Sequence, residues 1–260
     1  MVGLWDKYGW ALIVAGLIAA WTIQAVVNVR RRRAVNHRLV AISEFCGRRG
    51  MSQVDDNATM FVPEMIGMPS AVYSNSFATP DWTLWFSEIR DRQDRNAQER
   101  ANGYGVLLFT ADGMNIPYVA VARKGVVNMP AYVGGTRQSV GLESIDFNDR
   151  FRIQADDPRA AVMLVDLAMM QWLMDLDQVS FQISGPLVTA IVKASPTIEG
   201  VPAELDLLFR FRDGFAAHVP QMTFNEYPAQ PGMAAAILQA MRMSPDMLSS
   251  LLRGATIRQT

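Results

Sequence analysis

Residues able to carry out acid–base or nucleophilic chemistry are few in this chain and lie far apart. His37 follows a block of arginines, and His218 has no companion at metal-ligand spacing, so we expect structural or solvated roles for both histidines. The single cysteine, Cys46, falls on the apolar side of an expected helix, where an inert buried thiol is the simpler interpretation. None of these three residues forms the pair of groups that nucleophilic catalysis needs.

Motifs for phosphate binding or paired-carboxylate chemistry are equally weak. The run Gly103-Tyr104-Gly105 lacks the third glycine of the dinucleotide fingerprint, and a strand is expected after it where that fingerprint needs a helix. Gly134-Gly135-Thr136 has no lysine at the position that a P-loop demands. Asp156-Asp157-Pro158 is typical of a helix cap. We therefore expect a protein that is not an enzyme and that uses no cofactor and no metal.

The elements that would position these residues are mostly strands joined by short turns. The segments predicted as strands are 71–77, 82–89, 105–111, 118–123, 145–154, 179–184, 187–194 and 205–211. Short connections favour antiparallel pairing, because parallel strands need long crossovers. Helices are predicted over 34–49 and from Asp156 to about Leu176. The expected fold class is α+β, with a mostly antiparallel sheet of about seven strands and helices packed on it.

A long uncharged stretch precedes this domain. The twenty-two residues from Tyr8 to Val29 carry no formal charge, and Arg30-Arg31-Arg32-Arg33 follows directly. As a helix the stretch would span a hydrocarbon core of roughly 30 Å, and basic residues beside such a helix stay in the cytoplasm. This predicts a single N-terminal transmembrane helix in the inner membrane, with the N-terminus outside and the remaining chain cytoplasmic. A cleaved signal peptide would need its basic residues ahead of a shorter apolar run.

Two surfaces are predicted around this stretch. Small and amide residues form one strip along the expected helix, which suits docking onto another membrane helix, although small residues are common in any membrane helix. The residues of this docking strip are Ala11, Ala15, Gly16, Ala19, Ala20, Gln24 and Asn28. Basic side chains after it suit contact with anionic lipid headgroups. These are Arg30, Arg31, Arg32, Arg33 and Arg38.

The C-terminal tail adds a third candidate surface. Two helices are expected beyond Pro231, over 233–243 and from Ser244 to about Arg253. Their apolar side chains at groove-binding spacing are Met233, Ile237, Met241, Met247, Leu248 and Leu251. They form either a partner surface or a face that packs on the sheet of the same chain. The expected divisions are a membrane anchor (1–29), a basic juxtamembrane helix (30–50), an α+β cytoplasmic domain (51–230) and a helical tail (231–260).

Composition narrows the function classes. The formal net charge is −1, so no global basic field indicates nucleic-acid binding. One cysteine excludes an internal disulfide framework, in agreement with a cytoplasmic domain. A tethered domain without catalytic motifs is typical of an accessory factor of a membrane machine.

Several segments are similar to one family of anchored actinobacterial proteins. They are Met1 to Trp5, the arginine block after the uncharged stretch, Ile42 to Cys46, Phe61 to Met65 and Trp82 to Phe86. In these segments the chain resembles the mycobacterial trehalose monomycolate transport factor A family. The resemblance implies a non-enzymatic accessory factor of an MmpL-type inner-membrane lipid exporter. That exporter moves trehalose monomycolate, a precursor of the mycolic-acid envelope.

Two further functions stay open at this point. The chain is alternatively an accessory subunit of another inner-membrane complex, such as a respiratory complex. Otherwise it is a membrane-tethered domain that binds a lipid or another ligand, with Trp82, Trp85 and Phe86 lining a pocket.

Overall fold

The computed structural model describes residues 17–27, 37–54, 71–81, 83–91, 103–111, 114–127 and 137–219. By contacts the chain divides into two compact units, Met1–Ala41 and Ile42–Thr260. Residues 17–27 of the first unit are helical, and a second helical stretch, residues 37–47, begins in the first unit and ends in the second. The four-part division expected from the sequence stays a prediction.

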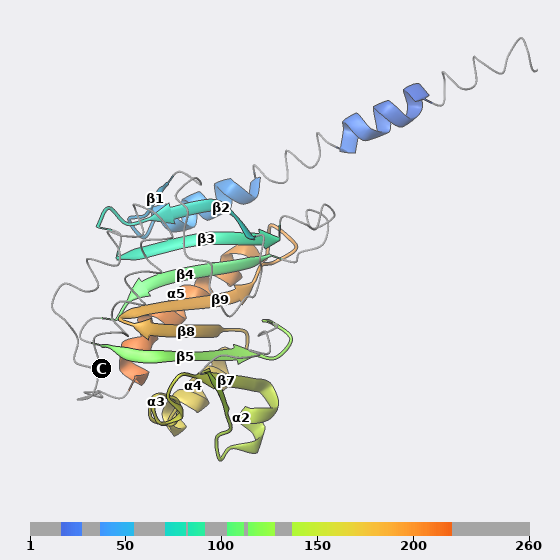
Figure 1. Cartoon of the computed structure of the whole chain (residues 1–260). Helices are drawn as coiled ribbons and strands as arrows, with labels where there is room; N and C mark the ends of the chain where they lie inside the picture. Colours follow the sequence, from blue (N-terminus) through green and yellow to red (C-terminus); the bar gives the residue numbers. More distant parts are fainter. Residues whose placement is uncertain are drawn as a thin grey trace, which may run out of the picture. The chain divides into compact units, whose positions relative to one another are not determined.

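The larger unit is built on one antiparallel sheet (Figure 1). Among the described residues its nine strands run in the order β1-β2-β3-β4-β9-β8-β5-β7-β6. Their bounds are β1 Ser52–Gln53, β2 Ala71–Ala78, β3 Leu84–Asp91, β4 Tyr104–Thr110, β5 Ile116–Arg123, β6 Gln138–Val140, β7 Phe151–Ala155, β8 Ser180–Gly185 and β9 Leu187–Lys193. The β8–β9 hairpin turns at Gly185, whose φ of 59° favours glycine.

Three short helices precede or follow β7 and are capped by side chains. They are α2 (Ile145–Arg150), α3 (Pro158–Leu164) and α4 (Leu167–Leu176). The side chain of Asp157 accepts from the Arg159 N–H at 2.9 Å, and that of Asp166 accepts from the Met169 N–H at 2.8 Å. Each cap satisfies a backbone N–H that the first turn of a helix leaves without an internal partner.

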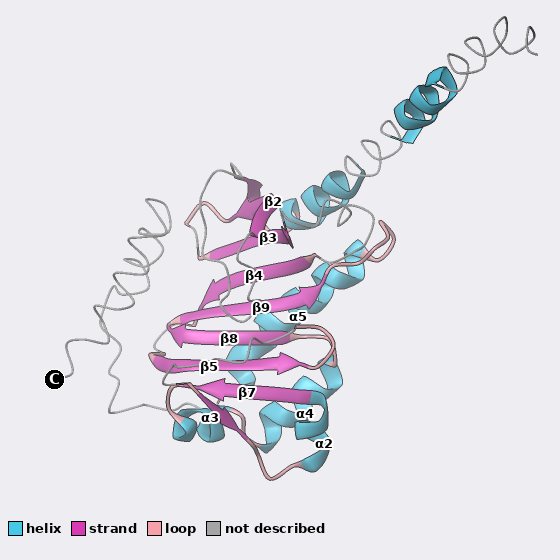
Figure 2. Cartoon of the chain, turned by 45° about the vertical axis from the view of Figure 1, so that its right-hand side comes forward, coloured by secondary structure: helices cyan, strands magenta, loops and turns pink. Residues whose placement is uncertain are grey.

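The long helix α5 (Val201–His218) lies along one face of the sheet (Figure 2). Its buried residues recur every three or four positions: Val201, Glu204, Leu205, Leu208, Phe209, Phe211 and Phe215. Phe211 and Phe215 pack against Phe109 of β4 and Phe181 of β8, with ring centroids 5.3–6.3 Å apart. This aromatic cluster is the centre of the core between α5 and the sheet.

The structure corrects several predicted elements. The strand predicted over 205–211 is part of α5, because its apolar residues face the sheet with helical spacing. The strand predicted over 145–154 is helix α2 followed by β7. The single helix predicted from Asp156 is two helices, α3 and α4, separated where Asp166 caps the second. In contrast, β4, β5, β8 and β9 confirm the strands predicted at those positions.

The predicted fold class is wrong on two counts. The sheet has nine strands in the described ranges, where about seven were expected, since β1 and β6 are too short to leave a periodic pattern. The transmembrane helix expected over Tyr8 to Val29 is also corrected. No helix in the described part of the chain is long and apolar enough to cross a membrane. Within that stretch, residues 8–16, 28 and 29 lie outside the described residues.

Candidate functional site

The helical residues 17–27, here called the apolar segment, expose large apolar side chains. Five of them are 52–74% exposed: Leu17, Ile18, Trp21, Ile23 and Val26. At 100° per residue these positions are spread around the helix and do not form one stripe. A helix that is apolar on all sides is stable where an apolar environment surrounds it.

The two polar side chains of the apolar segment, Thr22 and Gln24, add little polar surface to it. The Thr22 hydroxyl lies 2.8 Å from the Ile18 carbonyl oxygen and 2.9 Å from that of Ala19, so it donates within its own helix. Gln24 is the other polar side chain of residues 17–27, and it is exposed. The surface available to a partner is therefore nearly all hydrocarbon and indole.

The candidate residues predicted from the sequence fall partly within this segment. Ala19, Ala20 and Gln24 of the docking strip are described and exposed. Outside the described residues lie Ala11, Ala15, Gly16, Asn28, Arg30, Arg31, Arg32, Arg33, Met233, Ile237, Met241, Met247, Leu248 and Leu251. Arg38 is only 9% exposed, so it is not presented to lipid headgroups as expected.

The pocket expected around the aromatic residues of β3 is not formed by the two that are described. Trp85 and Phe86 are 3% and 0% exposed. As neighbours in one strand they point to opposite faces of the sheet. They therefore cannot line a common pocket, and Trp82 lies outside the described residues.

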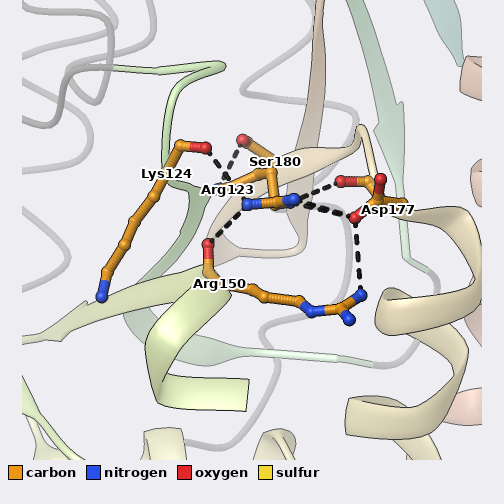
Figure 3. Close-up of polar contacts among 5 residues, drawn as sticks. All are labelled: Arg123, Lys124, Arg150, Asp177 and Ser180. Atoms are coloured by element: carbon orange, nitrogen blue, oxygen red, sulfur yellow. Dashed lines mark hydrogen bonds and ion pairs between the residues drawn. The ribbon is translucent and has the colours of Figure 1, made fainter. Parts of the chain in front are cut away.

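A dense polar cluster centres on Arg123 at the end of β5 (Figure 3). Its Nε donates to the Asp177 carbonyl oxygen at 2.8 Å, and one terminal nitrogen lies 3.0 Å from Asp177 Oδ1. The other terminal nitrogen donates to the carbonyl oxygens of Lys124 and Arg150, at 3.2 and 3.3 Å. The Ser180 hydroxyl accepts from the Arg123 backbone N–H at 2.9 Å. One guanidinium thus joins β5, the α2–β7 junction and the α4–β8 connection.

This cluster has the chemistry of a structural clamp. Asp177 follows α4 with φ of 53°, a left-handed conformation that costs energy in a residue other than glycine. Its carboxylate and carbonyl oxygens both accept from Arg123, which stabilises that turn. The guanidinium is engaged on all three of its nitrogens, so it is not available to hold a substrate anion.

His218 ends α5 in an aromatic stack. Its ring lies 4.3 Å from that of Trp172, with 5° between the planes, and Phe211 stacks on Trp172 at 5.1 Å. The Nδ1 atom lies 2.9 Å from the Gly214 carbonyl oxygen. A Cβ at Gly214 would approach Trp172 Cζ2 to 2.8 Å, so the indole requires glycine there. These contacts give His218 a packing role, the structural interpretation expected from the sequence.

Two buried carboxyl groups share the α5 face of the sheet, a feature that sequence reasoning did not single out. Glu88 of β3 is 1% exposed and pairs in register with Gly105 of β4. Glu204 of α5 is 7% exposed, and a Cβ on Gly105 would meet its Oε1 at 2.5 Å. Glu88 accepts from the Asn75 side-chain amide, and Glu204 Oε2 accepts from the backbone N–H of Ser195 at 2.8 Å. Both therefore bind neighbouring segments of the fold.

The remaining candidate groups are structural as well. Cys46 is buried, and this burial raises the pKa of its thiol to about 12. The Arg159 side chain beside Asp157 lowers the pKa of that capping carboxyl. Within the described ranges no group of three or more His, Cys, Asp and Glu residues is placed to hold a metal ion.

Comparisons with known proteins find similarity in structure rather than in sequence. No protein-family model and no curated protein sequence matches the chain. Among solved structures, the chain is similar to the mycobacterial trehalose monomycolate transport factor A, with a TM-score of 0.49 and 9% sequence identity. The similarity covers 72% of this chain and 98% of that one. At this level it assigns the chain neither a family nor a function.

Proposed function

We propose that this chain is a non-enzymatic accessory factor that is held at a membrane by its apolar segment and acts by binding another protein there. The observation that carries the proposal is the exposure of five large apolar side chains within residues 17–27. Burying such a side chain contributes about 1.5–3 kcal/mol. Five of them in water would be unfavourable by several kcal/mol, and lipid acyl chains or a partner helix remove this cost.

The sequence next to the apolar segment favours the cytoplasmic face of the inner membrane. Arg30 to Arg33 follow the segment after two residues, Asn28 and Val29. Each basic residue near an anionic leaflet contributes about 1 kcal/mol of attraction. A single buried cysteine suits a reducing compartment for the unit Ile42–Thr260.

The roles of the candidate catalytic groups support a binding function over an enzymatic one. Arg123 and Asp177 clamp three segments together, and Asp157 caps α3. His218 stacks on Trp172. Each of these groups already serves the fold, whereas the apolar segment exposes five large apolar side chains that lipid or a partner protein would cover.

Flotation with lipid vesicles tests the membrane contact. The full chain is expected to float with vesicles of phosphatidylethanolamine and phosphatidylglycerol. The double variant I18E/W21E removes two exposed apolar side chains and adds two charges, so its partition into the vesicles is expected to fall about 100-fold or more.

The matched control carries the same change on the larger unit. Ile145 and Leu167 are 75% and 77% exposed, against 58% and 74% for Ile18 and Trp21. I145E/L167E is therefore expected to float like the unsubstituted chain. Equal flotation of I18E/W21E, or equal loss in both double variants, would show that residues 17–27 do not provide the membrane contact.

The finer form of the proposal names the partner as an MmpL-type inner-membrane lipid exporter and its cargo as trehalose monomycolate. The sequence segments from Met1 to Trp5 and from Phe61 to Met65 support this form through their family resemblance. Docking would use the strip that contains Gly16 and Ala20, where small side chains let another helix approach closely.

Co-purification from detergent-solubilised cell membranes tests the partner. The full chain is expected to recover a polytopic lipid exporter. G16L/A20L is expected to lose the exporter while it still floats with vesicles, because leucine keeps the segment apolar but blocks close approach. Recovery of respiratory subunits, or of soluble proteins alone, would contradict the exporter and leave the membrane contact to be judged by flotation.

A further inference from the structure

Two arginines that follow the helical stretch 37–47 lie over aromatic rings. The guanidinium carbon of Arg49 is 4.0 Å from the ring centroid of Phe45 and 4.3 Å from that of Phe209 on α5. The guanidinium carbon of Arg48 is 5.8 Å from the Phe45 centroid. The face of an aromatic ring attracts a positive charge, so both cations are held over Phe45. We call Arg48 and Arg49 the arginine pair.

The two rings form a rigid support for the arginine pair. Phe45 and Phe209 are 7% and 1% exposed, and their centroids lie 5.5 Å apart. Both rings belong to the core of the larger unit, whereas Arg48 and Arg49 are exposed. The rings therefore hold the Arg49 guanidinium at the surface of this unit and leave its outer side accessible to water.

The backbone that carries Arg49 is fixed as well. Its N–H donates to the Cys46 carbonyl oxygen at 2.9 Å, and the Met51 N–H donates to the same oxygen at 3.1 Å. The Gly50 N–H donates to the Gly47 carbonyl oxygen at 3.0 Å, and Gly50 turns the chain with a φ of 74°. Backbone N–H groups thus satisfy the Cys46 and Gly47 carbonyls, so the arginine side chains are not needed to cap this helix end.

The guanidinium N–H groups of the arginine pair are not used by the described part of the chain. There, neither Arg48 nor Arg49 donates a side-chain hydrogen bond or forms an ion pair. By comparison, Arg123, Arg210 and Arg212 each have an aspartate carboxylate oxygen within 3.1 Å. The donors of the arginine pair are therefore left for water or for a ligand.

Nearby acidic groups do not cancel the charge of the arginine pair. Asp206 and Asp213 lie three residues before and four residues after Phe209, and both are paired with arginines of α5 itself, at 3.1 and 2.8 Å. Glu44 lies one turn before Arg48 and forms no ion pair within the described ranges. The two positive charges share one ring, so they lie within about 10 Å of each other and repel. An anion bound by both would relieve this repulsion.

We propose that Arg48 and Arg49 bind the phosphate group of an anionic lipid headgroup. The planar fork of a guanidinium matches two phosphate oxygens and binds them through charge-assisted hydrogen bonds. Because its rings already hold Arg49, little side-chain freedom is lost on binding. The proposal rests on the proposed function, in which the apolar segment brings the chain to a membrane. The formal net charge of −1 disfavours a nucleic acid as the source of the phosphate.

Flotation of the full chain with two kinds of vesicle tests this site. Anionic vesicles contain phosphatidylethanolamine and phosphatidylglycerol, and neutral vesicles contain phosphatidylcholine alone. R48Q/R49Q removes both charges and is expected to lower partition into the anionic vesicles about 30-fold, with no change for the neutral vesicles. Circular dichroism shows that the variant is folded. An equal fall with both kinds of vesicle would contradict recognition of an anionic headgroup.

A matched control removes the same charge from arginines that already have partners. R210Q/R212Q is expected to change partition into the anionic vesicles by less than about threefold, because both arginines are paired with aspartates at 3.1 and 2.8 Å. Equal falls in R48Q/R49Q and R210Q/R212Q would show attraction by general surface charge and would overturn the site.

Arg49→Lys separates the guanidinium fork from its charge. Lysine keeps the positive charge but lacks the planar fork. In neutral detergent, calorimetric titration with water-soluble dihexanoyl-phosphatidylglycerol is expected to show about tenfold weaker binding by Arg49→Lys than by the unsubstituted full chain. Equal affinity of the two chains would overturn the proposed role of the fork.

The same titration separates this site from the membrane contact of residues 17–27. I18E/W21E is expected to bind the short-chain lipid like the unsubstituted chain, although its flotation falls. If the short-chain lipid does not bind while the full chain still floats, the arginine site is overturned and the membrane contact stands.

A competitor distinguishes lipid from soluble phosphate compounds. The apolar segment keeps the chain at the vesicle, where headgroups have a high local concentration. Glycerol 3-phosphate at about 1 mM is therefore expected to leave flotation with the anionic vesicles unchanged. A fall as large as that caused by R48Q/R49Q would assign the site to soluble phosphate compounds and overturn the lipid headgroup as its ligand.

Discussion

Replacing Phe211 with alanine is expected to lower the free energy of unfolding by about 3–5 kcal/mol. Phe211 is fully buried and contacts Phe109, Trp172, Phe181 and Phe215, with ring centroids 5.1–6.3 Å away. Removing its ring leaves a cavity where β4, β8, α4 and α5 meet, and the stacked Trp172 loses one neighbour. The surrounding aromatic rings come from four different elements, so they cannot close the cavity without shifting the sheet against the helices.

Chemical denaturation of the full chain, followed by circular dichroism, measures this change. Phe211→Leu keeps most of the volume and is expected to cost about 1.5 kcal/mol. Ile145→Ala removes a side chain that is 75% exposed and should change the unfolding free energy by less than about 0.5 kcal/mol. Similar costs for Phe211→Ala and Ile145→Ala would mean that the aromatic cluster is not the centre of the core.

Replacing Arg123 with alanine is expected to cost about 2–3 kcal/mol. The substitution removes hydrogen bonds to four oxygens, those of the Asp177 side chain and of the backbone carbonyls of Asp177, Lys124 and Arg150. It also leaves the left-handed Asp177 turn without the group that stabilises it. The estimate stays modest because the Arg123 and Asp177 side chains are 22% and 43% exposed, which lets water replace part of the lost bonding.

A second arginine–aspartate pair provides a matched control. Arg210 and Asp206 lie 3.1 Å apart on α5, against 3.0 Å for Arg123 and Asp177, but their side chains are 63% and 53% exposed. Arg210→Ala is expected to cost less than about 0.5 kcal/mol. Thermal denaturation should therefore show a loss of about 5–10 °C for Arg123→Ala and about 1 °C for Arg210→Ala. Equal losses would show that the cluster acts as an ordinary surface ion pair.

Local signals located much of the sheet correctly. The runs that became β4, β5, β8 and β9 are rich in branched and aromatic residues and are bounded by turn residues such as Gly185. The helix that starts after Asp157 was recognised by its acidic cap and proline. These features act within a few residues of each other, so they can be interpreted without knowing the fold.

The misassigned helix α5 shows where local patterns become ambiguous. The run Leu-Asp-Leu-Leu-Phe-Arg-Phe from Leu205 alternates enough to suggest a strand, and Asp213-Gly214 suggests a turn. A longer window contains the helical signal, because Leu205, Leu208, Phe211 and Phe215 recur every three or four residues after Pro202. Gly214 serves close contact with Trp172, a partner that no local rule identifies.

The amino-acid sequence by itself determined where the main strands lie and how α3 is capped. Tertiary structure alone decided that β4 pairs with β9, that Glu204 lies over Gly105, and that Arg123 binds Asp177, 54 positions further along the chain. The physical reason is the separation in sequence between the residues that interact. Backbone periodicity and capping depend on neighbours within one or two turns, whereas strand order and buried polar contacts depend on which distant segments fold against each other.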